Sequence, residues 1–134
     1  MICIDPGVKL CGGAVFRGPE LVWARYLPKE LMPIALEHLV IEMPRIYPGS
    51  GQQKGDLNDL LNLAAVVGWL EGQTDDSSRV FPAAWKGQVP KKIMTARILS
   101  KLSPTELGCI EQIGAKTHNT IDAVGIGLWK LGRL

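Results

Sequence analysis

Three acidic residues are placed where a carboxylate could do chemistry. Asp5 follows the apolar run 1–4, and Glu42 follows the apolar run 39–41. Unbroken apolar runs of this kind are typical of strands that are buried on both faces of a sheet. If the two strands are parallel neighbours, both carboxylates lie at one edge of the sheet, because parallel strands end on the same side. Asp122, near the start of a helical pattern, is the third candidate.

The Asp-Pro-Gly sequence at residues 5–7 has three interpretations. Asp is common in turns that contain Pro-Gly, because its side chain bonds to nearby backbone. The same residue at a strand end could be a metal ligand, or the phosphate-loop Asp of an actin-like or sugar-kinase ATPase. Such an ATPase needs two domains around a nucleotide cleft, whereas 134 residues supply one domain, 1–134. We therefore expect no nucleotide cofactor and keep the turn and the metal ligand as alternatives. Glu42 has the same two alternatives, a ligand or a loop cap.

The C-terminal segment has the pattern of a helix with Thr117 as its N-cap. His118 and Asp122 are four residues apart and share one face of this helix, and we expect Asp122 in its first turn. The imidazole of His118 could bind a metal ion, or it could cap the helix or support a ligand by a hydrogen bond. Gly125 and Gly127 cost about 1 kcal/mol each against alanine inside a helix, which predicts close backbone packing.

Residues 83–102 contain five cations and no acid. A run like this is often only a solubilising face. A Trp-Lys-Gly loop, which we expect to be exposed, precedes the basic start of a helix, and this combination favours contact with phosphates. The cations are Lys86, Lys91, Lys92, Arg97 and Lys101.

The segment 45–55 is the most loop-like part of the chain, with three glycines and a proline. Loops beside a rigid site commonly carry substrate contacts, although any one of these side chains could instead be only solvated. The candidates for contact with phosphates or stacking on a base are Arg45, Tyr47, Gln52, Gln53 and Lys54.

Composition places the chain among globular domains, with 46% apolar and 21% charged residues. The apolar runs are shorter than the roughly 18 residues of a membrane span, and the N-terminus enters a strand at once, so we expect a cytoplasmic protein without membrane contact. The three cysteines lack metal-site spacing and are expected to be reduced core residues. The net charge is only +2, but 15 cations face 10 acids once the three candidate ligands are set aside, which suits a polyanionic partner.

The periodicity of the chain predicts an antiparallel three-strand meander followed by parallel strands and helices. Turns are expected at Pro6-Gly7 and at Gly12-Gly13. In the helix 56–72 we expect Leu57, Leu60, Leu61, Ala64, Val67 and Leu70 to form the buried face. The expected strands are 1–4, 14–16, 21–26, 39–42 and 79–81, and the expected helices are 56–72, 90–102, 104–113 and 117–131.

Four motifs in this order resemble those of the RuvC-type Holliday junction resolvases, which belong to the ribonuclease H-like superfamily. The chain is most similar to their short bacteriophage members, and the resemblance covers its whole length. It implies a ribonuclease H-like mixed five-stranded sheet flanked by helices. The motifs are Ile4-Asp-Pro-Gly7 with Gly12-Gly13, Val40-Ile-Glu-Met-Pro44, Trp85-Lys-Gly87 with Pro90-Lys91, and His118-Asn-Thr-Ile-Asp-Ala-Val124.

The resemblance implies an active site that holds two Mg²⁺ or Mn²⁺ ions. Asp5 would bridge the ions, with Glu42 and Asp122 as further ligands. Family members commonly place an acid or a His three residues before the last Asp, where this chain has Asn119. We therefore expect His118 as the fourth ligand and Asn119 as the alternative, because imidazole binds metal better than an amide does.

The resemblance also implies a partner and a reaction. The expected partner is branched DNA, a four-way junction that a homodimer cuts symmetrically by metal-dependent hydrolysis to leave 5′-phosphates. The helix 56–72 is the expected dimer interface. Two alternatives remain: a related nuclease that acts on other branched DNA, flaps or RNA–DNA hybrid, and a non-catalytic DNA-binding domain. The residues expected to contact DNA are Arg45, Tyr47, Lys54, Lys86, Lys91 and Lys92.

Overall fold

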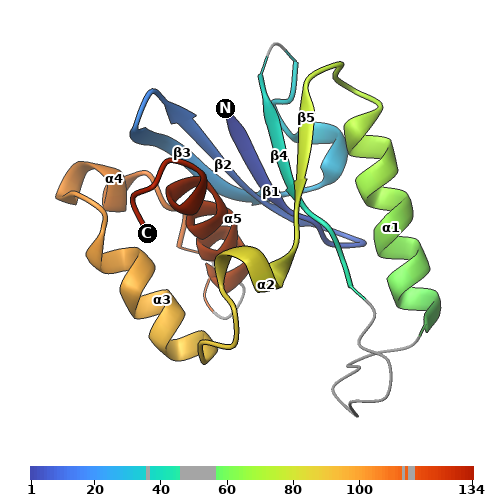
Figure 1. Ribbon diagram of the computed structural model, residues 1–134. Coiled ribbons are helices and arrows are strands. Elements are labelled where there is room, and N and C mark those ends of the chain that lie inside the picture. The colour runs from blue at the N-terminus through green and yellow to red at the C-terminus, as the bar shows by residue number, and fades with distance from the viewer. Residues whose placement is uncertain (36, 46–56, 113, 115–116) are drawn as a thin grey trace.

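The strands form one mixed five-stranded sheet, which confirms the predicted fold class (Figure 1). A computed structural model describes residues 1–134 apart from 36, 46–56, 113 and 115–116. The strand order is β3-β2-β1-β4-β5, in which the first three strands of the chain form an antiparallel meander while β4 runs parallel to β1 and to β5. The strands are β1 (Ile2–Asp5), β2 (Cys11–Arg17), β3 (Glu20–Leu27), β4 (Leu39–Glu42) and β5 (Ser77–Val80).

Alternate side chains of the central strands enter two cores, one on each face of the sheet. Ile2 and Ile4 of β1 belong to one core, and Cys3 between them belongs to the other. Helix α1 covers the first face, whereas α5 covers the second together with α2 and α3 (Figure 1). The helices are α1 (Leu57–Glu71), α2 (Pro82–Trp85), α3 (Lys91–Ser100), α4 (Pro104–Gly108), α5 (Thr117–Lys130) and the 3-10 helix η1 (Lys29–Leu31).

Helix α5 packs closely against β2 and α2 because two of its residues lack side chains. A Cβ atom on Gly127 would lie 2.1 Å from Cε2 of Phe16, and one on Gly125 would lie 2.6 Å from Cζ3 of Trp85. Real Cβ atoms do not approach other carbons this closely, so only glycine fits at either position. The close packing predicted for these two glycines is confirmed.

The predicted turn at Gly12-Gly13 is wrong, because both residues lie inside β2. Their lack of side chains serves packing. A Cβ on Gly13 would lie 2.7 Å from Sδ of Met32, and a Cβ on Gly12 would lie 2.1 Å from the carbonyl oxygen of Asn119 in α5. The turn between β1 and β2 falls earlier, at residues 6–10.

Other boundaries differ from the prediction for identifiable reasons. The helix expected to reach residue 113 ends at Gly108, because the chain then pairs with the sheet: the amide of Ala24 donates to the carbonyl of Cys109 at 3.1 Å. In α1 the buried residues are Val66, Val67 and Leu70, all in its C-terminal half. Leu57 and Leu61, which we expected to be buried, are 60% and 68% exposed.

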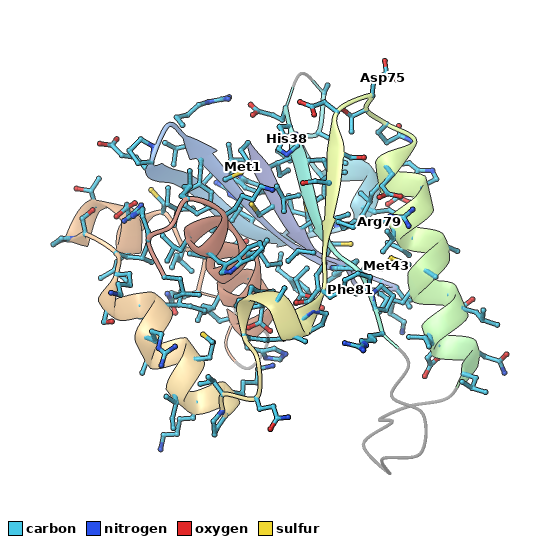
Figure 2. The ribbon with its side chains drawn as sticks, viewed as in Figure 1. Met1, His38, Met43, Asp75, Arg79 and Phe81 are labelled. Carbon is cyan, nitrogen blue, oxygen red and sulfur yellow. The ribbon has the colours of Figure 1, made fainter. Side chains whose placement is uncertain are left out.

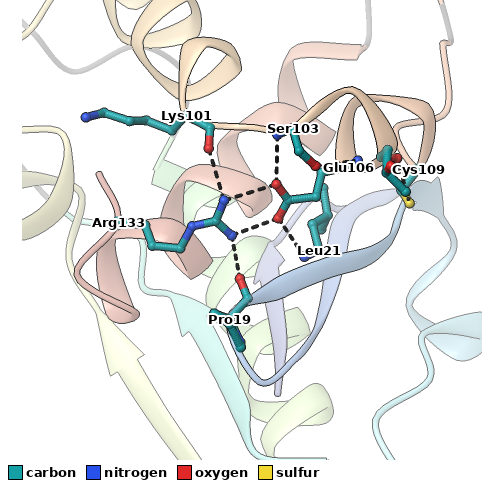
Figure 3. A network of polar contacts seen from close by, with 8 residues as sticks. Pro19, Leu21, Lys101, Ser103, Glu106, Cys109 and Arg133 are labelled. Carbon is teal, nitrogen blue, oxygen red and sulfur yellow. Dashed lines mark hydrogen bonds and ion pairs between the residues drawn. The ribbon is translucent and has the colours of Figure 1, made fainter.

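A buried ion pair joins the end of the chain to α4 and β3 (Figure 3). Glu106, only 6% exposed, accepts bonds from Nη1 and Nη2 of Arg133 at 2.7 and 3.0 Å. Its oxygens also accept from the amides of Leu21 at 3.0 Å and Ser103 at 2.8 Å. The Ser103 hydroxyl in turn accepts from the Glu106 amide, which completes a capping box at the start of α4. This network holds the segment after α5 in place.

Cys3 and Cys11 are buried in the sheet and Cys109 is partly buried, and all three are free thiols, as expected of reduced core residues. In the part of the chain that the structure describes, no helix combines the length and the apolar character needed to cross a bilayer.

Candidate active site

Asp5 and Glu42 occupy the carboxyl ends of two adjacent parallel strands. β1 and β4 are paired with Ile4 opposite Ile41, so the acid that follows each of these residues lies at the same edge. Figure 2 shows this edge: Met43 and Phe81, which follow β4 and β5, lie together there, while His38 lies at the opposite end of the sheet. The parallel arrangement therefore brings together two acids that are 37 positions apart in the sequence.

Asp122 reaches the same place because α5 starts directly over β2. Gly12 is the strand partner of Asp5. The carbonyl group of Asn119 lies against Gly12, in the space that a Cβ on Gly12 would fill. The expectation that Asp122 lies in the first turn of α5 is wrong. The helix begins at Thr117, so Asp122 lies in its second turn, and the first turn contains no acid. Asp122 is 9% exposed.

The three carboxylates affect one another electrostatically. The pKa of Asp5 is raised well above its usual range, first by desolvation in the surrounding protein and then by the negative charges of Glu42 and Asp122. The cations Lys86 and Lys91 offset part of this shift. The site thus concentrates negative charge, which a bound cation can neutralise.

Glu42 is held by two donors from the end of α2. The indole Nε1 of Trp85 donates to Oε2 at 2.6 Å, and Nζ of Lys86 lies 3.2 Å from the same oxygen. Burial alone lowers the pKa of Lys86, but the charges of Glu42, Asp122 and Asp5 outweigh burial and raise that pKa. The ammonium group of Lys86 therefore stays charged in the site.

The predicted exposure of the Trp-Lys-Gly sequence is wrong for its first residue. Trp85 is only 5% exposed and belongs to the core between the sheet and α5. Its large apolar ring fills the space beside Gly125, while its N–H donates to the Glu42 carboxylate. Lys86 is 28% exposed and lies at the surface of the site.

A cleft of about 870 Å³ opens beside the acids. Arg45, Lys86 and Lys91 line it together with Asp122, and Nζ of Lys91 lies 3.9 Å from Oδ2 of that acid. Lys92 is exposed in the first turn of α3 but is not part of the lining. Tyr47, Gln52, Gln53 and Lys54 lie outside the described residues.

His118 and Asn119 are partly buried in the first turn of α5. They precede Asp122 by four and three residues, so each lies on a helix face next to that acid. The backbone contact of Asn119 with Gly12 fixes the height of this turn above the sheet.

The donor set has the chemistry of a site for a hard divalent cation, because Mg²⁺ and Mn²⁺ prefer carboxylate oxygens. Within the described residues, no three His, Cys, Asp or Glu side chains are grouped so as to enclose an ion as they stand. Glu42 is turned toward Trp85 and Lys86, and Asp122 faces Lys91. The carboxylates are donors of the kind that such an ion prefers, and Lys86 and Lys91 are cations that face them in this structure.

Comparison with solved structures identifies the fold. No family model matches the sequence, and no curated protein matches it. The structure of RuvC from Thermus thermophilus superposes with a TM-score of 0.55 over 98% of this chain and 97% of that one, at 13% identity. This chain has a RuvC-like fold. A second structure, T. thermophilus RuvC in complex with a Holliday junction substrate, matches at a TM-score of 0.47 and 11% identity over 99% and 98% of the two chains. The resemblance to bacteriophage members stays a prediction.

Two residues of the site were missed by sequence reasoning. Gly12 was assigned to a turn, although its place opposite Asp5 makes it the contact point for α5. Trp85 was assigned to an exposed loop, although it donates to Glu42. The signal that could have identified Trp85 is its position: it is a large aromatic residue directly before Lys86, a lysine already expected at the site.

Proposed function

We propose that this protein is a metal-dependent endonuclease that resolves four-way DNA junctions. The observation that carries the proposal is the convergence of three carboxylates, from β1, β4 and α5, beside a cleft lined by cations on a RuvC-like fold. The four sequence motifs of the RuvC-type resolvases include all three acids, which links the fold to this chemistry.

In the proposed site, Asp5, Glu42 and Asp122 hold Mg²⁺ or Mn²⁺, two ions per site, with His118 as the fourth ligand and Asn119 as the alternative. Bound ions of this kind activate a water molecule and stabilise the leaving oxygen of a phosphodiester, and the product keeps a 5′-phosphate. The protein's own residues orient the carboxylates, as the indole of Trp85 does for Glu42. Lys86 and Lys91, which face the acids in the free protein, turn to the DNA phosphates when DNA enters the cleft.

The DNA backbone is bound by the cations of the cleft and its rim, Arg45, Lys86, Lys91 and Lys92, and by Tyr47 and Lys54 of the segment that follows Arg45 in the sequence. Binding through phosphates releases counterions, so the affinity falls steeply as the salt concentration rises.

The proposed homodimer uses α1 as its interface. Leu61 follows Leu57 by four residues and Trp69 follows Leu61 by eight, and the three side chains are 60%, 68% and 38% exposed. Residues at this spacing form one stripe along a helix. Leu31 adds to this apolar surface: it is 63% exposed, and η1 is joined to α1 by the ammonium of Lys29, 5.3 Å from the centre of the Trp69 ring. An apolar stripe of this size on a helix is suited to a second copy of the chain.

The test is cleavage of a labelled synthetic four-way junction beside linear duplex, flap and RNA–DNA hybrid, with Mg²⁺, Mn²⁺ or EDTA. We expect paired nicks in opposing junction strands, lost in EDTA and in Asp5→Asn. Cleavage of another substrate in preference to the junction would show that the protein is a related nuclease and not a junction resolvase. Junction binding without any cleavage would leave a DNA-binding domain and refute the catalytic proposal.

A further inference from the structure

The bond from Trp85 to Glu42 joins a core residue to a carboxylate of the site. Its length of 2.6 Å is that of a charge-assisted hydrogen bond, which is roughly twice as strong as a neutral one. The Trp85 ring is 5% exposed, so the bond lies in surroundings where water competes little for the carboxylate oxygen.

Of the two donors to Glu42, only Trp85 has a fixed position. Its ring is confined by α5, since a Cβ on Gly125 would lie 2.6 Å from Cζ3 and 3.1 Å from Cη2 of the ring. Lys86 has a long side chain that is 28% exposed, and its ammonium can leave Glu42 without disturbing the core. Nζ of Lys86 also donates to Oε1 of Glu42 at 3.4 Å, so the departure of Lys86 would free Oε1 while the indole bond to Oε2 remains.

The contact with Gly125 also connects Trp85 to Asp122, another acid of the site. Gly125 follows Asp122 by three residues in α5, and therefore lies on the same side of the helix, one turn later. The same indole ring thus sets the distance of α5 from β4 and the orientation of the carboxylate at the end of β4. An apolar core residue such as Phe would provide the first of these effects but not the second.

We propose that Trp85 is a positioning residue for the metal site: its N–H holds Oε2 of Glu42 so that Oε1 is presented to the ion. This inference rests on the proposed function, because it assumes that Glu42 binds a divalent cation. Hydrogen-bond partners behind metal ligands typically contribute about 10- to 100-fold in metal affinity, and a single bond of this kind is expected at the lower end of that range.

The experiment measures Mn²⁺ binding by calorimetry, and the melting temperature without metal, in the intact protein. Trp85→Phe removes the N–H and part of the ring. Incorporation of 3-benzothienylalanine at the same position keeps the shape of the ring and replaces only the N–H by sulfur. Trp129→Phe on the outer, 37% exposed end of α5 is the matched control. Junction affinity in EDTA is measured for each variant as a check that the cleft is intact.

We expect the benzothienyl variant to keep its melting temperature within a few degrees and its junction affinity in EDTA, and to bind Mn²⁺ about 10-fold more weakly. Trp85→Phe should show at least the same loss, and Trp129→Phe none. Equal Mn²⁺ affinity in the benzothienyl variant and the wild type would overturn the inference and leave the metal site standing. Absence of Mn²⁺ binding by the wild type would overturn both. Loss of stability without loss of Mn²⁺ affinity would assign Trp85 a purely structural role and also overturn the inference.

Discussion

The ion pair between Glu106 and Arg133 makes a quantitative prediction about stability (Figure 3). The bond from Arg133, together with the amides of Leu21 and Ser103, outweighs burial and lowers the pKa of Glu106 from 4.5 to about 2. Each pKa unit corresponds to about 1.4 kcal/mol, so ionised Glu106 contributes about 3 kcal/mol to the free energy of unfolding. Both partners are largely buried, at 8% and 25% side-chain exposure, and solvent screening is therefore weak.

The sign follows from the direction of the shift. Because the pKa is lowered in the folded state, the contribution is complete above pH 4.5, the ordinary pKa of the group, and is lost as the pH falls toward about 2. Glu106→Gln removes the charge but keeps the size of the side chain. At pH 7 we expect this variant to be less stable than the wild type by about 3 kcal/mol, and at pH 2.5 the difference should shrink to less than about 1 kcal/mol.

The assay is urea unfolding of the wild type and the variant at pH 7, 5, 3.5 and 2.5, with Glu111→Gln on an exposed site as the control. The difference in free energy of unfolding between the wild type and Glu106→Gln at each pH is not affected by the titration of the other carboxylates, because it is common to both proteins. A difference that stays constant with pH would refute the argument, because it would show that the variant loses packing and not the ion pair. The result bears on the active site as well, since this network holds the end of α5, the helix that carries Asp122.

Four further predictions concern the site. Gly12→Ala should abolish detectable Mn²⁺ binding, because its Cβ would overlap the α5 backbone at 2.1 Å; calorimetry measures this. Lys86→Met should tighten Mn²⁺ binding about 3- to 10-fold without DNA and weaken junction binding, because it removes a competing cation from the acids. In the metal-free protein, the free energy of unfolding should fall as the pH rises from about 4 through the raised pKa of Asp5, and Asp5→Asn should remove this fall. Lys91→Ala/Lys92→Ala should weaken junction binding and reduce its salt slope by about 2, as gel shifts at several salt concentrations would show.

For each of these four predictions, one experimental result would contradict the reasoning. Gly108→Ala, where a Cβ meets open space, is the control for Gly12→Ala, and equal Mn²⁺ binding by both would refute the contact with α5. Lys101→Met, at an exposed lysine outside the cleft lining, is the control for Lys86→Met, and unchanged Mn²⁺ affinity in both would show that Lys86 does not compete with the ion. An unchanged salt slope in the double variant would remove Lys91 and Lys92 from the DNA contacts, and a pH profile shared by wild type and Asp5→Asn would contradict the raised pKa.

Much of the fold could be predicted because its signals are local. The apolar runs before Asp5 and Glu42 identify buried strands, and the carboxylates that end them lie at one edge because parallel strands share an edge. The sequence Ser103-Pro-Thr-Glu106 contains its own capping box, whose two hydrogen bonds need no residue from elsewhere. The strand ends and the capping box depend on residues within a few positions of one another, and the sequence determined them by itself, whereas the pairing of β1 with β4 joins residues about 37 positions apart.

Tertiary structure decided what depends on distant residues. Gly12 looks like a turn residue until α5 is placed over β2, and Trp85 looks exposed until Gly125 of the same helix leaves room for its ring. The partner of Glu106 is Arg133, and no spacing in the sequence relates the two. In each case the physical reason is the same. The burial of a side chain, its bonding partner, or the need for glycine at a position depends on which surface packs against that position. That in turn depends on how the whole sheet and its helices assemble.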